Sequence, residues 1–175
     1  MVTMRFDREA YASSNSAFSE IKIWIRIADI ELLGLEEAED DPIQAGLRLW
    51  VPDIARHGLL ALYRAKQYGY ADFDIGCEFG EMLIFKMVGD TVLVHSTIRE
   101  KTVQVSYERL EQAWIGFASQ ARAFLSTHFA TLAENDYWSS WLRGDPEAIL
   151  EPRPEDPAWF QSHDYFFARI DGTER

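Results

Sequence analysis

Residues 71–135 read ADFDIGCEFGEMLIFKMVGDTVLVHSTIREKTVQVSYERLEQAWIGFASQARAFLSTHFATLAEN, and this stretch decides the fold. In its first half, apolar and polar residues alternate in short runs, as they do in half-buried strands. Turn residues separate these runs at positions 79–80, 89–90 and 99–101. In its second half, apolar residues recur at every third or fourth position, which is the period of an amphipathic helix. The stretch therefore predicts a meander of four antiparallel strands that leads into one long helix.

The four predicted strands cover residues 72–79, 81–88, 91–98 and 101–106. The first is expected to point Phe73, Ile75, Cys77 and Phe79 inward, and Asp72, Asp74 and Glu78 outward. The second is apolar on nearly both faces, which predicts a central strand covered on both sides. The third is expected to bury Val92, Val94 and Ile98 on one face and to carry Leu93 and His95 on the other.

The predicted helix begins after Ser106, a residue type that caps helix N-termini well. One apolar stripe continues along it, formed by Leu110, Trp114, Phe117, Ala121, Phe124, His128 and Leu132. A helix of about 28 residues would be ~42 Å long, which is enough to cross the whole sheet.

The N-terminal half predicts further elements. Residues 1–18 are polar and Ser-rich, which indicates a short helix or a lead-in arm. Residues 20–27 predict a strand with four isoleucines on one face and Lys22, Trp24 and Arg26 on the other. The alternation then slips by one residue, so a bulge or bend is expected at Ala28-Asp29. Residues 47–51 indicate a short strand or a helical turn, and a helix is expected from Pro52 to about Gln67, closed by Gly69.

Together these patterns predict an α+β fold, in which an antiparallel meander of about four to six strands packs against one long helix and one shorter helix. A chain of 175 residues is expected to form a single globular domain over positions 1–175. Residues 145–175 are rich in proline and aromatic residues, which predicts an irregular tail that packs back on the domain.

Composition limits the functions that the chain could have. The net charge of −12 argues against a nucleic-acid binder, because such proteins need cations to displace counterions. No apolar run approaches the ~20 residues that span a bilayer, so no membrane partner is expected. The single cysteine, Cys77, excludes an intramolecular disulfide, and a reducing cytoplasm is the expected location.

The sequence contains no motif that carries a known chemistry. None of the four histidines has metal-ligand spacing, and neither a serine-nucleophile elbow nor a phosphate loop is present. Cys77 and His95 could approach each other across the sheet, but Cys77 alternates with apolar residues and is interpreted as a buried small hydrophobe. We therefore expect no catalytic residue, metal or cofactor.

Acidic residues are concentrated in a few segments. Residues 28–47 contain seven acids and no Lys or Arg, and residues 67–85 contain four acids and again no Lys or Arg. If the two segments are adjacent in the fold, they form one negative patch, which would attract a basic partner. Trp24 could act as an exposed aromatic anchor of the kind found in interface hot spots.

A small, acidic, single-domain α+β chain without a catalytic motif resembles the immunity proteins of bacterial toxin–immunity systems. The resemblance implies a tight complex with a cognate, basic, nuclease-like toxin and no enzymatic activity. The residues that could contact such a toxin are Glu36, Glu37, Glu39, Asp40, Asp41, Asp72, Asp74, Glu78 and Trp24.

Two other classes of function stay open. Six tryptophans and eleven phenylalanines could line a small-molecule or enzyme pocket between sheet and helix. Alternatively, the long helix could form the interface of a homo-oligomer if its apolar face were wide enough to include Ile115, Phe117 and Leu125.

Overall fold

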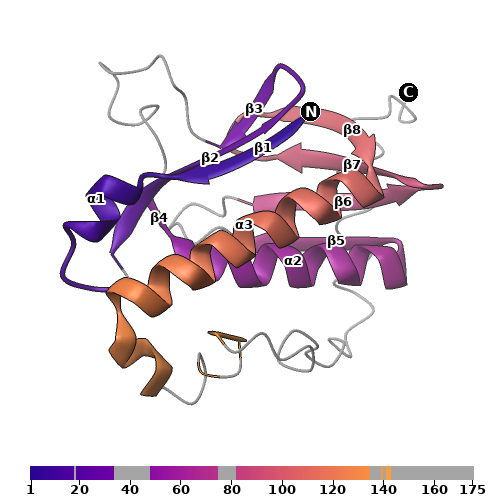
Figure 1. Cartoon of the computed structure of the whole chain (residues 1–175). Coiled ribbons are helices and arrows are strands. Elements are labelled where there is room, and N and C mark those ends of the chain that lie inside the picture. Colours follow the sequence, from indigo (N-terminus) through magenta and orange to yellow (C-terminus); the bar gives the residue numbers. More distant parts are fainter. Residues whose placement is uncertain (18, 34–47, 75–81, 135–138, 140, 143–175) are drawn as a thin grey trace.

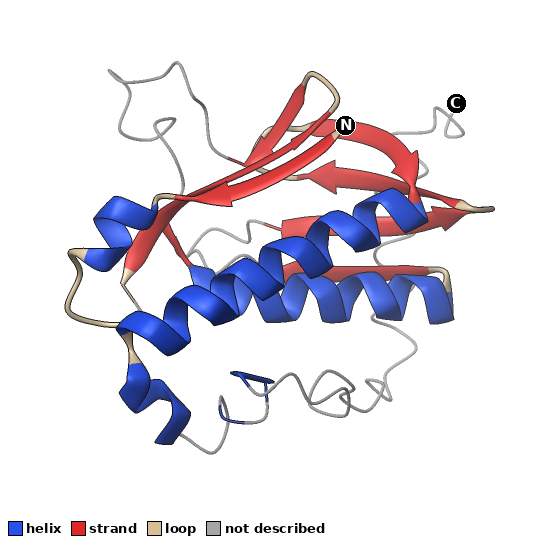
Figure 2. Ribbon diagram, in the orientation of Figure 1, coloured by secondary structure: helices blue, strands red, loops and turns tan. Residues whose placement is uncertain are grey.

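The computed structural model describes residues 1–17, 19–33, 48–74, 82–134, 139 and 141–142. These residues form two antiparallel sheets and two long helices (Figure 1), so the fold is α+β as the sequence predicts. The two long helices run side by side against the sheets (Figure 2). None of the described helices is long and apolar enough to cross a membrane.

The first sheet is built around the isoleucine-rich strand. Strand β2 (Glu20–Ile27) has the predicted bounds, and it pairs with β1 (Val2–Phe6) on one side and with β3 (Ile30–Leu33) and β4 (Arg48–Trp50) on the other. The four isoleucines of β2 are buried, and Lys22, Trp24 and Arg26 lie on the opposite face, as predicted. The short strand expected near residues 47–51 is therefore β4.

Residues 1–17 contain the short helix that the sequence allowed, but a strand that was not predicted precedes it. Residues 2–6 form strand β1, in which the buried Met4 and Phe6 alternate with the exposed Thr3 and Arg5. A short helix, α1 (Arg8–Ala12), follows, and its N-cap Asp7 accepts a hydrogen bond from the Ala10 amide at 2.9 Å.

The predicted irregularity at Ala28-Asp29 is the turn of the β2–β3 hairpin. Ala28 has a φ of 53°, in the left-handed region that non-glycine residues seldom adopt. The bulge lies further back, where the pairing of β2 with β3 shifts between Ile25 and Arg26. The change of alternation in the sequence therefore marks a reversal of the chain.

The second sheet is the predicted meander, with β5 (Tyr70–Asp74), β6 (Met82–Val88), β7 (Thr91–Ser96) and β8 (Lys101–Ser106) paired in chain order. Leu83, Ile84 and Phe85 are all buried, so β6 is covered on both faces over these residues. At its far end Val88 is 46% exposed, so the predicted cover does not extend along the whole strand. The positions expected to extend the first strand, Ile75, Cys77, Glu78 and Phe79, lie outside the described residues.

Two long helices complete the core. Helix α2 (Val51–Tyr68) ends at Gly69, whose left-handed φ of 86° makes it the predicted C-cap. Helix α3 (Tyr107–His128) begins after Ser106 but ends earlier than predicted, and a short 3₁₀ helix, η1 (Ala130–Glu134), follows it. Helix α2 packs mainly on β5 and β6 and also contacts β2 and β4, and α3 contacts both β1 and β8, so each of the two helices joins the two sheets.

Trp114 of α3 packs against α2 and forms a hydrogen bond to it. Its ring lies edge-on to those of Phe73 and Phe85, and its indole nitrogen donates a hydrogen bond to the Ile54 carbonyl of α2 at 3.1 Å. A Cβ at Gly58 of α2 would lie 1.9 Å from the Trp114 ring. Only glycine therefore leaves room for this tryptophan.

Candidate functional site

The structure describes only part of the predicted partner-binding surface. Glu36, Glu37, Glu39, Asp40, Asp41 and Glu78 lie outside the described residues. Asp74 is the last residue of β5, Asp72 lies half-buried on the same strand, and Trp24 lies half-buried on β2. The described members of the predicted surface therefore come from two different sheets.

Asp72 belongs to a row of residues that crosses the second sheet. Asp72 is paired with Ile84 on β6, Ile84 with His95 on β7, and His95 with Thr102 on β8. His95 is only 5% exposed, and its Nδ1 atom lies 2.9 Å from the Thr102 hydroxyl. Burial lowers the pKa of His95 below its usual value, although the Glu100 carboxylate acts to raise it. A neutral imidazole is therefore favoured at neutral pH.

Trp24 lies among cations on the outer face of the first sheet. Arg5 is its direct partner on β1, and the Arg5 guanidinium sits 4.7 Å from the centre of the indole ring, in cation–π contact. Lys22 and Arg26 flank Trp24 on the same face of β2. The indole nitrogen is buried and has no hydrogen-bond partner among the described residues. Trp24 thus lies beside Lys22 and Arg26, as the sequence predicts, and Arg5 of β1 is a third cation next to it.

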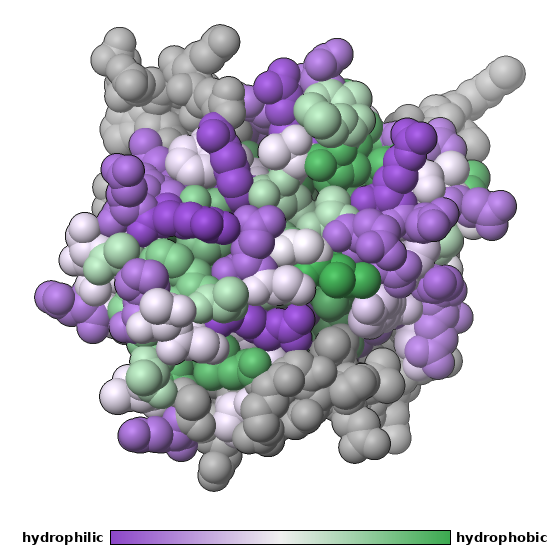
Figure 3. All heavy atoms as spheres, viewed as in Figure 1, coloured by the Kyte–Doolittle hydropathy of each residue, from purple (hydrophilic) through white to green (hydrophobic). Residues whose placement is uncertain are grey.

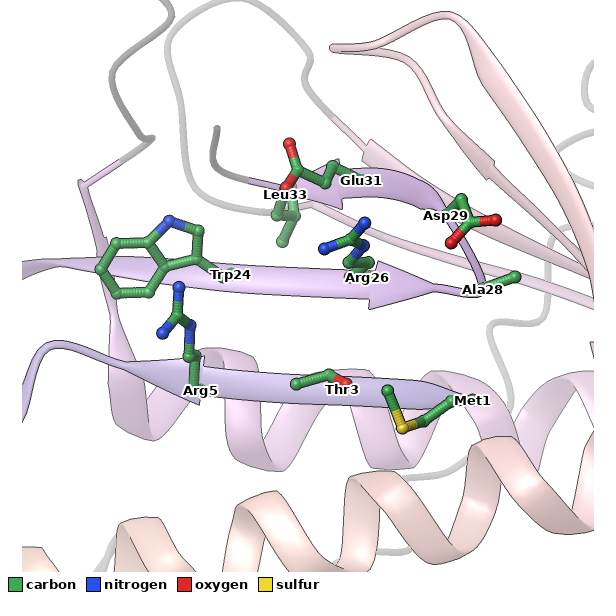
Figure 4. Close-up of a pocket in the computed structure, with 9 residues that line it drawn as sticks. All are labelled: Met1, Thr3, Arg5, Trp24, Arg26, Ala28, Asp29, Glu31 and Leu33. Atoms are coloured by element: carbon green, nitrogen blue, oxygen red, sulfur yellow. The ribbon is translucent and has the colours of Figure 1, made fainter. Parts of the chain in front are cut away.

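A groove of about 300 Å³ crosses this face of the first sheet (Figure 4). Arg5 and Trp24 lie at one end of it, Asp29 lies at the other end, and Arg26 lies between them. Glu31 and Leu33 of β3 line the far side. Sequence reasoning placed Trp24 and Arg26 on one face but missed Arg5, because that requires β1 and its register against β2. The available signal was the alternation of Val2, Met4 and Phe6 with Thr3 and Arg5.

A second ionisable cluster lies near the N-terminus of α2. Burial raises the pKa of Asp53, while His57 and Arg56 act to lower it. Burial and the Asp53 carboxylate also raise the pKa of Tyr11, whose hydroxyl donates to the Ala17 carbonyl. Tyr11 is fully buried, so it serves packing here.

The aromatic residues between the helices and the sheets pack on one another. Phe73, Phe85 and Trp114 have ring centres 5.7 to 6.3 Å apart. Phe6 lies edge-on to Phe117, with the ring centres 5.9 Å apart. These rings fill the space between sheet and helix, so they do not favour a ligand pocket there.

The described face of α3 does not favour an oligomer interface. Phe117 and Leu125 are buried in the core of the same chain, and only Ile115 of the three proposed interface residues is partly exposed. His128, which the sequence pattern places on the apolar stripe, is exposed and stacks on Phe124. Hydrophilic and hydrophobic residues are interspersed on the face of the molecule in Figure 3.

Within the described part of the chain, no three His, Cys, Asp or Glu side chains are grouped so that they could hold a metal ion. No protein-family model, curated protein or solved structure matches this chain.

Proposed function

We propose that this chain is a binding protein of the immunity type, which neutralises a cognate, basic, nuclease-like toxin through an acidic surface and catalyses no reaction itself. The observation that carries the proposal is the distribution of charge. The described residues contain 13 acidic and 13 basic side chains, so they are neutral as a set. The whole net charge of −12 belongs to the segments outside them, where 16 acids accompany four arginines.

The excess of acidic charge is confined to a few segments. This distribution supports a role in binding a partner rather than a role in keeping the whole protein soluble. Charge that served solubility alone would be spread over the framework as well. A concentrated negative field raises the rate at which a cationic partner associates and guides its orientation. The acids that would supply this field are Glu36, Glu37, Glu39, Asp40 and Asp41, together with Asp72, Asp74 and Glu78.

The test is affinity capture from the native cytoplasm, at low and at high salt, with two variants that change the net charge equally. The first variant replaces the five acids of residues 36–41 by their amides. The control replaces five exposed acids of the described framework by theirs: Glu9, Asp90, Glu100, Glu108 and Glu134.

The proposal predicts that the unmodified chain and the framework control both retain one stoichiometric basic protein, which the loop variant loses. Coexpression of that protein alone should arrest growth, and coexpression with this chain should restore it. Failure to retain a basic partner at low salt would contradict the proposal. Equal retention by the loop variant would contradict the assigned surface.

A further inference from the structure

Helix α2 is buried on the side that faces away from the core as well as on the side that faces it. At about 3.6 residues per turn, Leu60 lies opposite the middle of the side that carries the core residues Val51, Leu62 and Ala65. Yet Leu60 is only 4% exposed, although it does not belong to the hydrophobic core that the described residues form. Arg56, one turn earlier on the same side, is also buried. The core of the described residues therefore does not account for the burial of this side of α2.

The cover of this side has to come from the chain itself. The burial is a property of the single chain, so neither a second copy nor a partner protein produces it. Residues 75–81 connect Asp74 and Met82, which are direct partners in the β5–β6 ladder, so this short loop must return to the strand edge where it begins. Residues 34–47 connect β3 to β4, both in the first sheet, and contain no aromatic residue. Both sheets lie on the same side of α2 (Figure 1). The C-terminal tail, residues 145–175, is the remaining long segment.

We propose that residues 145–175 dock on the outer face of α2, which we define as Arg56, Leu60 and Arg64, with apolar tail side chains over Leu60 and tail carboxylates beside the two arginines. The tail has the apolar side chains that such a cover needs, since it contains Trp159, Phe160, Tyr165, Phe166 and Phe167. It follows directly on Leu142, which packs on the core. Helix α2 is ~27 Å long, and an extended chain spans about 3.3 Å per residue, so the tail is long enough to follow the whole helix.

The charges of the two surfaces are complementary. The tail contains eight acids and three arginines, whereas the outer face of α2 carries Arg56 and Arg64. Asp53 supplies one acid beside Arg56. None of the positions three or four residues from Arg64 along the chain is an acid, because they hold Leu60, Ala61, Gln67 and Tyr68. Burying a cation is costly unless an anion comes with it, so a cover rich in carboxylates fits this face better than an apolar one.

A docked tail limits which surfaces a partner protein can contact. It closes the outer face of α2, and the arginines there neutralise part of the tail's acidity within the chain. This leaves the acids of residues 36–41 as the main source of the negative field in the proposed function. The docking itself does not depend on a toxin, so the experiments on the tail and the capture of a partner can fail separately.

The direct test is the measurement of nuclear Overhauser effects from the Leu60 methyl groups in the unmodified, full-length chain. Their signals are assigned by their loss in Leu60→Ile, a substitution that nearly conserves volume. The proposal predicts contacts between these methyl groups and protons of residues 145–175. Leu59 is the matched control, because it is the next residue of the same helix but belongs to the core, and its methyl groups should contact core protons and none of the tail. Contacts of Leu60 with residues 34–47 or 75–81 in place of the tail, or with α2 alone, would overturn the proposal.

The part of the arginines is tested by chymotrypsin, which cleaves after aromatic residues and reaches those of the tail only when the tail is released. Arg64→Gln should speed cleavage within residues 145–175 roughly threefold, because an ion pair at a half-buried site is lost. Lys66→Gln removes the same charge from an exposed position outside this face and should be cleaved as slowly as the unmodified chain. Mass analysis identifies the fragments, and the amide spectrum of each variant reports its folding. Equal cleavage rates in all three proteins would overturn the pairing of the tail with Arg64.

Discussion

At the scale of single residues, Trp24 combines two features that oppose each other. Its ring supports Arg5 through a cation–π contact, which is favourable. Its indole nitrogen is buried and finds no acceptor among the described residues, which costs about 1–3 kcal/mol of stability. A buried donor without an acceptor is unusual in a folded protein, so the indole nitrogen of Trp24 is a specific point at which the fold can be tested.

Trp24→Phe separates these two features, because it keeps an aromatic ring beside Arg5 and removes the buried donor. We expect the free energy of unfolding to stay the same or to rise by about 1 kcal/mol. Trp24→Ala is the comparison, and it should lower this free energy because the ring itself is lost. Urea unfolding measures the free energy of unfolding of both variants and of the unmodified chain. A loss of more than 1 kcal/mol in Trp24→Phe would show that the indole nitrogen has a partner in the folded protein.

At the scale of elements, the contact between α2 and α3 depends on one glycine. Gly58→Ala places a methyl group 1.9 Å from the Trp114 ring and should destabilise the fold by about 1–3 kcal/mol or more. Gly116→Ala on α3 is a matched control, because a Cβ there meets no atom within 4 Å, and it should stabilise the helix by roughly 0.5–1 kcal/mol. Thermal unfolding of both variants tests this pair. Equal effects would contradict the close approach of the two helices.

The second sheet should also respond to pH through His95. Because burial lowers the pKa of His95 in the folded chain, its contribution to stability is present above the unfolded value of about 6.5 and is lost as the pH falls. We expect the unfolding free energy to decrease between pH 7.5 and 5.5 and His95→Gln to reduce this decrease. His128→Gln, at an exposed site, is the control. The same pH dependence in all three proteins would refute the prediction.

The elements that the sequence predicts well are those with sharp periodicity and clear breakers. Strands β2 and β8 and the C-cap Gly69 match the structure because alternation or a left-handed glycine marks them. Strand β1 was missed because its alternation covers only five residues before a Ser-rich stretch. The end of α3 was misplaced because Leu132 continues the apolar stripe and is buried, although it lies in η1 after the helix has ended.

The candidate site was less predictable, for a physical reason. The face that carries Lys22, Trp24 and Arg26 follows from alternation within one strand. The position of Arg5 over Trp24 depends on the pairing of β1 with β2, which is a tertiary relation. Sequence reasoning could therefore place Trp24 beside Lys22 and Arg26 but could not place Arg5 over its ring.

At the scale of the whole molecule, a charge-balanced framework is combined with acidic segments. This division is the basis of the proposed function, and it predicts how association with a basic partner depends on salt. Screening shortens the range of the field to about 10 Å at 0.1 M salt, so an association that is steered by these acids must slow as salt is added.

The proposed role of the acidic segments is tested by the association rate between this chain and its captured basic partner, measured by stopped flow across a range of salt concentrations. The unmodified chain and the framework control should both show a rate that falls steeply with salt. The variant with amides in place of the five acids of residues 36–41 should associate about tenfold more slowly at low salt, with a flatter dependence. If that variant has the same rate and the same salt dependence as the unmodified chain, these acids do not guide binding and the account is contradicted.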